Sequence, residues 1–358
     1  MCKNVCASPV LWRLSAFFLF FLPLFSWVSP SMACSRVVYP GKENQVVTGR
    51  TMDWAEDMGT NLWIFPRGMK RNGAMGKDSL EWTSKYGSLA ASIYEGATAD
   101  GMNEKGLVAN LLYLAESEFP PSGDPRPALV ISTWAQYALD NFATVKEAVA
   151  ALEGETFRVV PVKTPNGIAG NGHLALSDPS GDSAIFEYIG GKLRIHHGKE
   201  YQVMTNSPVY DQQLALNAYW EELGGTVMLP GTNRAADRFV RASFYINACR
   251  QSSDPREAVA DVFSVIRNVS VPRGISTPEK PNISSTIWRV VGDQKNLIYY
   301  FEDTANPSVL WVKLKKIDFS ENSGVRKLFL VNRWDLGGDQ TGGFEKVEPF
   351  AFLSPVKQ

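Results

Sequence analysis

A hydrophobic segment near the start of the chain decides which residues can belong to the fold. Two basic residues precede the apolar run from Phe17 to Val28, and the tetrapeptide Ser31-Met32-Ala33-Cys34 follows it. The small residues Ser31 and Ala33 stand at the −3 and −1 positions of a signal-peptidase site. The pattern predicts a secretory signal peptide over residues 1–33 and one folded domain over residues 34–358, which begins with a cysteine.

Two other interpretations of this leader stay open. A retained membrane anchor is one, although the run is shorter than the roughly 20 apolar residues of a membrane span, and a proline interrupts it. A lipoprotein signal is the other, since it also ends before a cysteine; it usually has leucine where this chain has Ser31. Cleavage alone predicts no stable membrane insertion, whereas acylation of Cys34 predicts a lipid-anchored binding protein.

Charge and histidine content narrow the classes of partner. The chain has 36 Lys and Arg residues against 37 Asp and Glu residues, and a leader with Lys3, Arg13 and no acidic residue leaves 34 against 37. This balance implies no basic surface for nucleic acid. The three histidines, His173, His196 and His197, lack a metal-ligand spacing such as HExxH. We therefore predict no nucleic-acid partner, no metal and no other cofactor.

Cleavage after residue 33 would leave two of the four cysteines, Cys34 and Cys249. Two cysteines so far apart do not form a disulfide framework, and Cys249 is interpreted as a structural residue. Cys34 would carry a thiol and a free α-amine on one residue. In model peptides these groups have pKa values near ~8.5 and ~8, so the amine can accept the thiol proton near neutral pH. Nucleophile and base would then need no histidine.

The residues after Cys34 predict a hairpin. Ser35 to Tyr39 and Val46 to Arg50 are strand-like, with a Pro-Gly turn between them. The hairpin would bring Arg50 beside Cys34, where its charge favours a thiolate. Asp53, just beyond, can accept hydrogen bonds from an α-ammonium group and orient it. The plainer alternative for Arg50 and Asp53 is a surface ion pair of little energetic value.

Hydrophobic spacing divides the rest of the chain into groups of strands and pairs of helices. One helix is predicted from Ile131 to Phe142, and a capping box at Thr144 and Glu147 starts the next. Later helices are predicted to start at Asp211, Arg234 and Asp254, and strands to cover 61–65, 87–94, 106–114, 173–176, 183–188, 192–197, 201–204, 284–291, 297–302 and 309–314. This order predicts an α+β fold with two antiparallel sheets between helical layers. The glycine-rich tail from Asn322 is predicted to wrap the surface.

Several motifs, taken together with a cysteine at the start of the domain, resemble the choloylglycine hydrolase family of N-terminal-nucleophile hydrolases. The motifs are Gly49-Arg50-Thr51-Met52-Asp53-Trp54, Asn103-Glu104-Lys105-Gly106-Leu107, Met204-Thr205-Asn206-Ser207-Pro208, Leu229-Pro230-Gly231 and Arg238-Phe239-Val240. The resemblance covers nearly all of residues 34–315. Within the family, segments 63–66, 114–117 and 233–239 are most similar to penicillin V acylases of Gram-negative bacteria. The resemblance implies a four-layer αββα sandwich that hydrolyses non-peptide C–N amide bonds.

Amide hydrolysis needs donors that face the oxyanion of a tetrahedral intermediate, each worth roughly 3 kcal/mol. Asn206, before a turn proline, is the side-chain candidate, although asparagine there is by default a turn residue. The resemblance implies that the main-chain N–H of Tyr113 is the second donor. It also implies an active-site role for Arg238, as a partner of Asp53 or of substrate charge, where a helical arginine is usually solvated. The expected catalytic set is Cys34, Arg50, Asp53, Tyr113, Asn206 and Arg238.

Two aromatic residues, Trp54 and Tyr113, are the expected substrate contacts. Their plainer interpretation is as core aromatics. Bile salt hydrolases of the family have asparagine at the position of Tyr113. An aromatic pocket suits a phenoxyacetyl or fatty acyl group better than a steroid.

These expectations together predict a periplasmic amide hydrolase that forms an acyl-enzyme at Cys34. Its substrate would be a small-molecule amide such as penicillin V, which yields 6-aminopenicillanic acid, and N-acyl homoserine lactones are plausible natural substrates. A conjugated bile salt hydrolase is the alternative in the same class. The resemblance implies a homotetramer, but the segment between Asn206 and Arg238 is shorter than in bile salt hydrolases, where it helps to assemble one.

Overall fold

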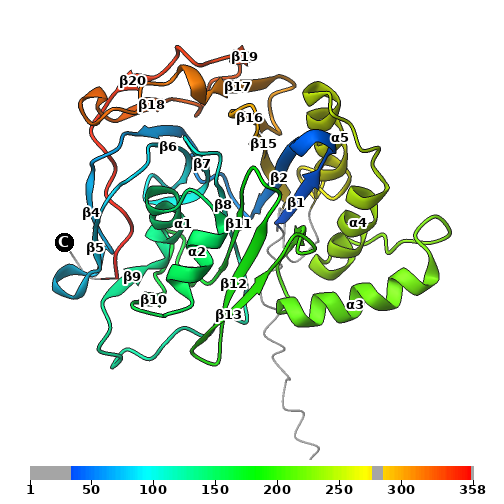
Figure 1. Cartoon of the computed structure of the whole chain (residues 1–358), viewed down its shortest axis with the longest axis horizontal. Coiled ribbons are helices and arrows are strands. Elements are labelled where there is room, and N and C mark those ends of the chain that lie inside the picture. Colours follow the sequence, from blue (N-terminus) through cyan, green and yellow to red (C-terminus); the bar gives the residue numbers. More distant parts are fainter. Residues whose placement is uncertain (1–33, 276–284, 356–358) are drawn as a thin grey trace, which may run out of the picture. The chain divides into compact units, whose positions relative to one another are not determined.

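Two β-sheets stacked face to face form the centre of the protein (Figure 1). The computed structural model describes residues 34–275 and 285–355, and the predicted signal peptide lies outside them. Within the described ranges, one sheet has seven strands in the spatial order β14 (Val203–Met204), β1 (Ser35–Pro40), β2 (Val46–Trp54), β15 (Ser285–Asp293), β16 (Ile298–Asp303), β17 (Val309–Lys313) and β19 (Gly338–Asp339). All its neighbours are antiparallel except β17 and β19.

The second sheet is wholly antiparallel. Its nine described strands follow the order β13 (Lys192–His197), β12 (Ser183–Ile189), β11 (His173–Ser177), β8 (Val108–Leu112), β7 (Ala97–Asn103), β6 (Ser88–Ile93), β3 (Leu62–Phe65), β18 (Arg326–Leu328) and β20 (Glu345–Lys346). Two small ladders complete the strands: β4 (Lys70–Asn72) with β5 (Glu81–Thr83), and β9 (Ala128–Val130) with β10 (Arg158–Val160).

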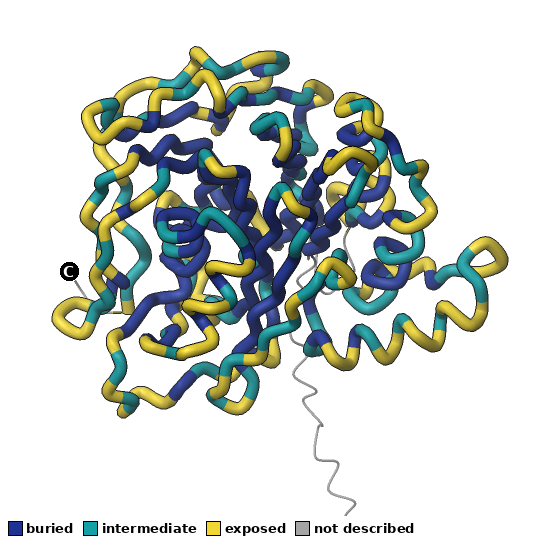
Figure 2. Tube along the Cα trace, in the orientation of Figure 1, coloured by how far each residue is buried: buried dark blue, intermediate teal, exposed yellow. Residues whose placement is uncertain are grey.

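Helices cover the outer face of each sheet. They are α1 (Ile131–Asn141), α2 (Val145–Leu152), α3 (Tyr210–Leu223), α4 (Ala235–Ala248) and α5 (Pro255–Asn268). The first two pack on the nine-stranded sheet, α4 and α5 pack on the seven-stranded sheet, and α3 packs on α4. The buried residues concentrate in the central strands and the inner helix faces (Figure 2). The predicted four-layer αββα arrangement is therefore confirmed.

Two of the predicted helix N-caps are confirmed and one is wrong. Thr144 Oγ1 accepts a hydrogen bond from the main-chain N–H of Glu147, so α2 begins where the sequence places it. Asp254 caps α5 in the same way, and Pro255 follows as the first helical residue. The prediction for Asp211 was wrong. Val209 is the N-cap residue of α3, and the Asp211 carboxylate lies inside the first turn, 2.8 Å from a histidine nitrogen.

Strand β7 and the C-terminal tail are where the structure departs most from the predicted pattern. The sequence of β7 is Ala-Thr-Ala-Asp-Gly-Met-Asn, in which Thr98 is the one β-branched residue and no residue is aromatic, so the usual signal of a strand is weak. It is nevertheless buried along its whole length. The tail was predicted to wrap the surface, but β18 and β20 extend the nine-stranded sheet and β19 extends the other. These short edge strands join the sheets through main-chain hydrogen bonds, which do not require an alternating hydrophobic pattern. The sequence therefore contained no signal for them.

Close packing of α5 on the seven-stranded sheet depends on Gly49 in β2. A Cβ atom at this position would lie 2.4 Å from Val262 Cγ1 and 3.0 Å from Ile266 Cγ2, both on α5. Real side chains do not approach so closely, so any larger residue must push the helix away from the strand. The close contact between α5 and the hairpin that follows Cys34 therefore requires glycine at position 49.

We predict that Gly49→Ala lowers the free energy of unfolding by about 1–3 kcal/mol, because the added methyl group overpacks this contact. The measurement is the urea midpoint of the purified protein. Gly123→Ala is the matched control, since Gly123 is exposed and its Cβ would have no neighbour within 4 Å. Equal midpoints for Gly49→Ala and the wild type would contradict this account of the packing.

Candidate active site

The hairpin of β1 and β2 brings a buried thiol and a buried guanidinium together. Ser35 pairs with Thr51 and Arg36 with Arg50, which sets the register directly beside Cys34. Cys34 Sγ lies 3.9 Å from Arg50 Nη2 and 3.8 Å from the main-chain oxygen of Asp53. The prediction that Arg50 lies beside Cys34 is confirmed, and the surface ion-pair alternative is wrong because both side chains are buried.

Arg50 is held mainly by groups from the opposite sheet. Its Nη1 donates to the main-chain oxygen of Ala99 on β7 at 2.9 Å, and its Nη2 donates to that of Leu111 on β8 at 2.9 Å. Asp100 Oδ2 is 3.4 Å from Nη1, and the guanidinium lies over the Trp288 ring, 4.9 Å from its centroid. These contacts fix a positive charge next to the sulfur.

Asp53 is a fully buried carboxylate behind the cysteine. Thr286 Oγ1 donates to Asp53 Oδ1 at 2.6 Å, while Asp53 Oδ2 lies 3.9 Å from Arg238 Nη1 and has no hydrogen-bond partner among the described residues. Burial raises the pKa of Asp53 to about 6, although the positive charge of Arg238 opposes that rise. The main-chain nitrogen of Cys34 donates to Asn206 Oδ1 in the uncleaved chain. The predicted contact between Asp53 and a free α-ammonium stays a prediction.

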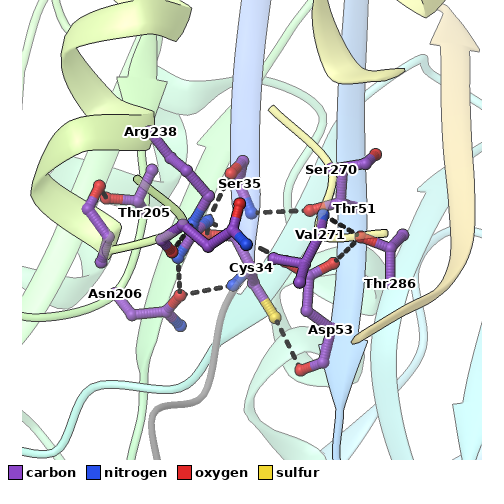
Figure 3. A network of polar contacts seen from close by, with 12 residues as sticks. Cys34, Ser35, Thr51, Asp53, Thr205, Asn206, Arg238, Ser270, Val271 and Thr286 are labelled. Carbon is purple, nitrogen blue, oxygen red and sulfur yellow. Dashed lines mark hydrogen bonds and ion pairs between the residues drawn. The ribbon is translucent and has the colours of Figure 1, made fainter. Parts of the chain in front are cut away.

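Arg238 organises the site from the first turn of α4. Its Nη1 donates to the main-chain oxygen of Cys34 at 2.6 Å and to Ser35 Oγ at 2.5 Å, and its Nη2 donates to Asn206 Oδ1 at 3.0 Å (Figure 3). The pKa of Arg238 lies below its usual value because the side chain is buried, and the negative charge of the nearby Asp53 opposes this lowering. The alternative of a solvated helical arginine is wrong, because this side chain is fully buried.

Asn206 and Tyr113, the two residues expected to supply oxyanion donors, meet next to the cysteine. The donor role of the Tyr113 main-chain N–H stays a prediction. Asn206 Nδ2 donates to the main-chain oxygen of Tyr113 at 2.7 Å, which leaves its second N–H for another acceptor. The loop that carries Asn206 is fixed by Gln213 of α3, a residue that no sequence motif singled out. Gln213 Nε2 donates to the main-chain oxygens of Asn206 and Pro208, and its Oε1 accepts from Thr205 Oγ1 at 3.0 Å.

An apolar pocket opens beside the sulfur. Trp54 and Tyr113 both line it, with their rings edge to face and their centroids 6.2 Å apart. The other lining side chains are mainly aliphatic and include Met58, Ile93 and Leu353. Both predicted substrate contacts therefore lie in the pocket wall, and Trp54 is at the same time largely buried. The pocket therefore places a largely apolar lining directly beside the thiol.

Cys249, metal binding and membrane insertion were the other features considered from the sequence. Cys249 is half-buried and, like Cys34, is a free cysteine. In the part of the chain that the structure describes, no group of three or more His, Cys, Asp or Glu side chains is placed to hold a metal ion. Nor does any helix in the same ranges have the length and apolar character needed to cross a membrane.

This geometry joins a thiol, two buried arginines and the Asn206 amide to an apolar pocket, an arrangement suited to acyl transfer. The family model of linear amide C–N hydrolases, choloylglycine hydrolase family, matches residues 34–326, and the chain belongs to that family. Its resemblance, predicted from short motifs, is confirmed.

Individual relatives are similar over most of their length. Penicillin V acylase of Pectobacterium atrosepticum is 51% identical, and the match covers 90% of this chain and 92% of that protein. The structure of penicillin V acylase from Agrobacterium tumefaciens is 57% identical with a TM-score of 0.84, covering 90% of this chain and all of that one. A conjugated bile acid hydrolase from Clostridium perfringens has the same fold, with 24% identity, a TM-score of 0.71 and coverage of 82% and 96%.

We predict that Arg238→Met destabilises the protein by about 3–5 kcal/mol, because it leaves the buried Asp53 carboxylate without its positive partner. Arg234→Met is the matched control, since Arg234 precedes the same helix and is exposed. The double variant Asp53→Asn with Arg238→Met should regain part of the loss. Urea unfolding of the variants checks both statements. A double variant that loses the sum of the two single effects would contradict electrostatic pairing of Asp53 and Arg238.

Proposed function

We propose that the protein hydrolyses penicillin V to 6-aminopenicillanic acid and phenoxyacetate, with Cys34 as the nucleophile after removal of residues 1–33. The observation that carries the proposal is the position of Cys34 Sγ, beside the Arg50 guanidinium and at the wall of an apolar pocket. High identity to two penicillin V acylases supports the choice of substrate.

In the first step the α-amine of Cys34 accepts the thiol proton, and the sulfur attacks the carbonyl carbon of the acyl group. The negative oxygen of the tetrahedral intermediate accepts hydrogen bonds from Asn206 Nδ2 and from the main-chain N–H of Tyr113. The Asn206 side chain is fixed before the charge develops, which is what lowers the barrier. Asp53 and Arg238 hold the α-ammonium and the Cys34 main chain in place.

In the second step the intermediate collapses and the C–N bond breaks. The α-ammonium gives its proton to the departing nitrogen. 6-Aminopenicillanic acid therefore leaves with its amine neutral, and a thioester remains on Cys34. A water molecule then attacks the thioester and gives its proton to the α-amine. The C–S bond breaks as the α-ammonium gives this proton to the sulfur, which restores the thiol and the amine, and phenoxyacetic acid leaves and releases its proton to water to become phenoxyacetate.

The shape of the pocket supports an aryl or alkyl acyl group. Trp54 and Tyr113 present two aromatic rings to a phenoxy group, for which edge-to-face contacts are favourable. Met58 and Ile93 extend the apolar wall, so linear fatty acyl groups also suit the pocket. N-Acyl homoserine lactones, which have such a chain on an amide, are therefore proposed as a second substrate class. A conjugated bile salt is the less favoured alternative, because the relatives named for it are much more distant.

Location and assembly are part of the same proposal. The predicted signal peptide supports a periplasmic location. A homo-oligomer, and by family resemblance a homotetramer, is supported by apolar side chains on the outer face of α3, where Leu216, Tyr219 and Leu223 are 43%, 61% and 42% exposed. Three exposed apolar residues on one face of a helix are unusual for a surface that contacts only water.

We predict that Cys34→Ser lowers kcat for penicillin V on the order of 10³-fold or more, because the alcohol is a far weaker nucleophile than the thiolate. Cys249→Ser, the matched control, should keep wild-type kcat. Release of the amine product from penicillin V, glycocholate and N-acyl homoserine lactones is the measurement. Undiminished turnover by Cys34→Ser would overturn the mechanism, and a clear preference for glycocholate would overturn the substrate.

A further inference from the structure

The C-terminal tail contributes a wall to the pocket beside Cys34. The family model ends at residue 326, so the tail lies beyond the part of the chain that defines the family. After β20 the tail runs past β4 and β5 (Figure 1). Near its end the side chain of Leu353 lines the same pocket as Cys34, Trp54 and Tyr113. A residue more than 300 positions from the nucleophile thus shapes the space next to it.

The main chain at Leu353 is fastened on both sides. Its N–H donates to the main-chain oxygen of Gly96 at 2.7 Å, and its carbonyl oxygen accepts from Ser132 Oγ at 2.8 Å. A Cβ atom on Gly96 would lie 2.7 Å from Leu353 Cγ. The leucine side chain can therefore pack against residue 96 only because that residue is glycine.

Aromatic contacts hold the tail in place before it reaches the pocket. The Phe350 ring packs edge to face on Trp63, with centroids 5.0 Å apart, and Phe352 packs on Phe350 at 4.9 Å. The Arg71 guanidinium lies 5.7 Å from the centroid of the Phe352 ring. These contacts and the two hydrogen bonds of Leu353 do not involve its side chain, so that side chain can be changed without releasing the tail.

Strand β7 gives the order of groups along the pocket. Arg50, which contacts the sulfur, donates to the main-chain oxygen of Ala99. Ala97 and Ala99 both line the pocket, as expected for alternate residues on one face of a strand. Gly96, which touches Leu353, is the turn residue directly before β7 and precedes Ala99 by three positions. Leu353 therefore lies at the end of the pocket away from the Arg50 contact.

We propose that Leu353 is a specificity-determining residue that closes the far end of the acyl pocket and limits the length of the acyl group. The inference rests on the proposed function, since it assigns this pocket to the acyl group of the amide substrate. A linear acyl chain would extend from the thioester carbon past Trp54 and Tyr113 and end against the leucine side chain. Aryloxyacetyl and medium-length fatty acyl groups would fit, and longer chains would collide with Leu353.

The experiment compares kcat/KM for amides of one amine with hexanoyl, octanoyl, decanoyl and dodecanoyl groups. Leu353→Ala should raise the decanoyl-to-hexanoyl ratio roughly tenfold, which is what burial of about two further methylenes supplies. Leu353→Phe should lower the same ratio. Val347→Ala is the matched control, because this apolar tail residue packs away from the pocket, near the Trp63 cluster, and it should leave the ratio unchanged.

Binding separates this inference from the proposed function. Calorimetric titration with the free carboxylic acids of the same lengths measures the pocket without any hydrolysis, and Leu353→Ala should gain affinity selectively for the longer acids. Unchanged chain-length profiles in both Leu353 variants would overturn the inference while leaving amide hydrolysis intact. A wild-type protein that hydrolyses none of the amides would instead overturn the proposed function, and the titrations would still decide the role of Leu353.

Discussion

Two arginine side chains without solvent contact hold the cysteine, and the rest of the site depends on how their charges are compensated. An isolated buried charge is strongly destabilising, so each guanidinium needs a full set of partners. Arg238 finds them at Cys34, Ser35 and Asn206, with Asp53 nearby. Arg50 finds them on the opposite sheet. The stacking of the two sheets is thus a condition for the reactive geometry as well as for the core.

The distribution of histidines supports an unusual source for the catalytic base. His173 pairs with Glu187, while His196 and His197 pair with aspartates outside the site, each at 2.8 or 2.9 Å. Among the described residues, the polar and sulfur contacts of Cys34 Sγ are with Arg50, Met52 and the main-chain oxygen of Asp53. None of these accepts a proton near neutral pH. An α-amine on Cys34 itself would supply the missing base, and it requires only a cut before that residue.

Much of the fold could be predicted because its signals are local. The hairpin after Cys34, the caps at Thr144 and Asp254 and the amphipathic helices each depend on neighbouring residues, and the structure confirms them. Strand β7 was missed because small and polar residues carry no strand pattern. Gln213 and Leu353 were missed for a different reason. Their roles arise from contacts across the fold, which no spacing within the sequence encodes.

The mass of the N-terminal peptide of the secreted protein tests the central claim most directly. The account predicts a chain that starts at Cys34 with an unmodified amine, because that amine is the base. A chain that starts at another residue, or a lipid or other acyl group on the first nitrogen, would contradict it. Mass spectrometry after proteolysis distinguishes these outcomes without any assumption about the substrate.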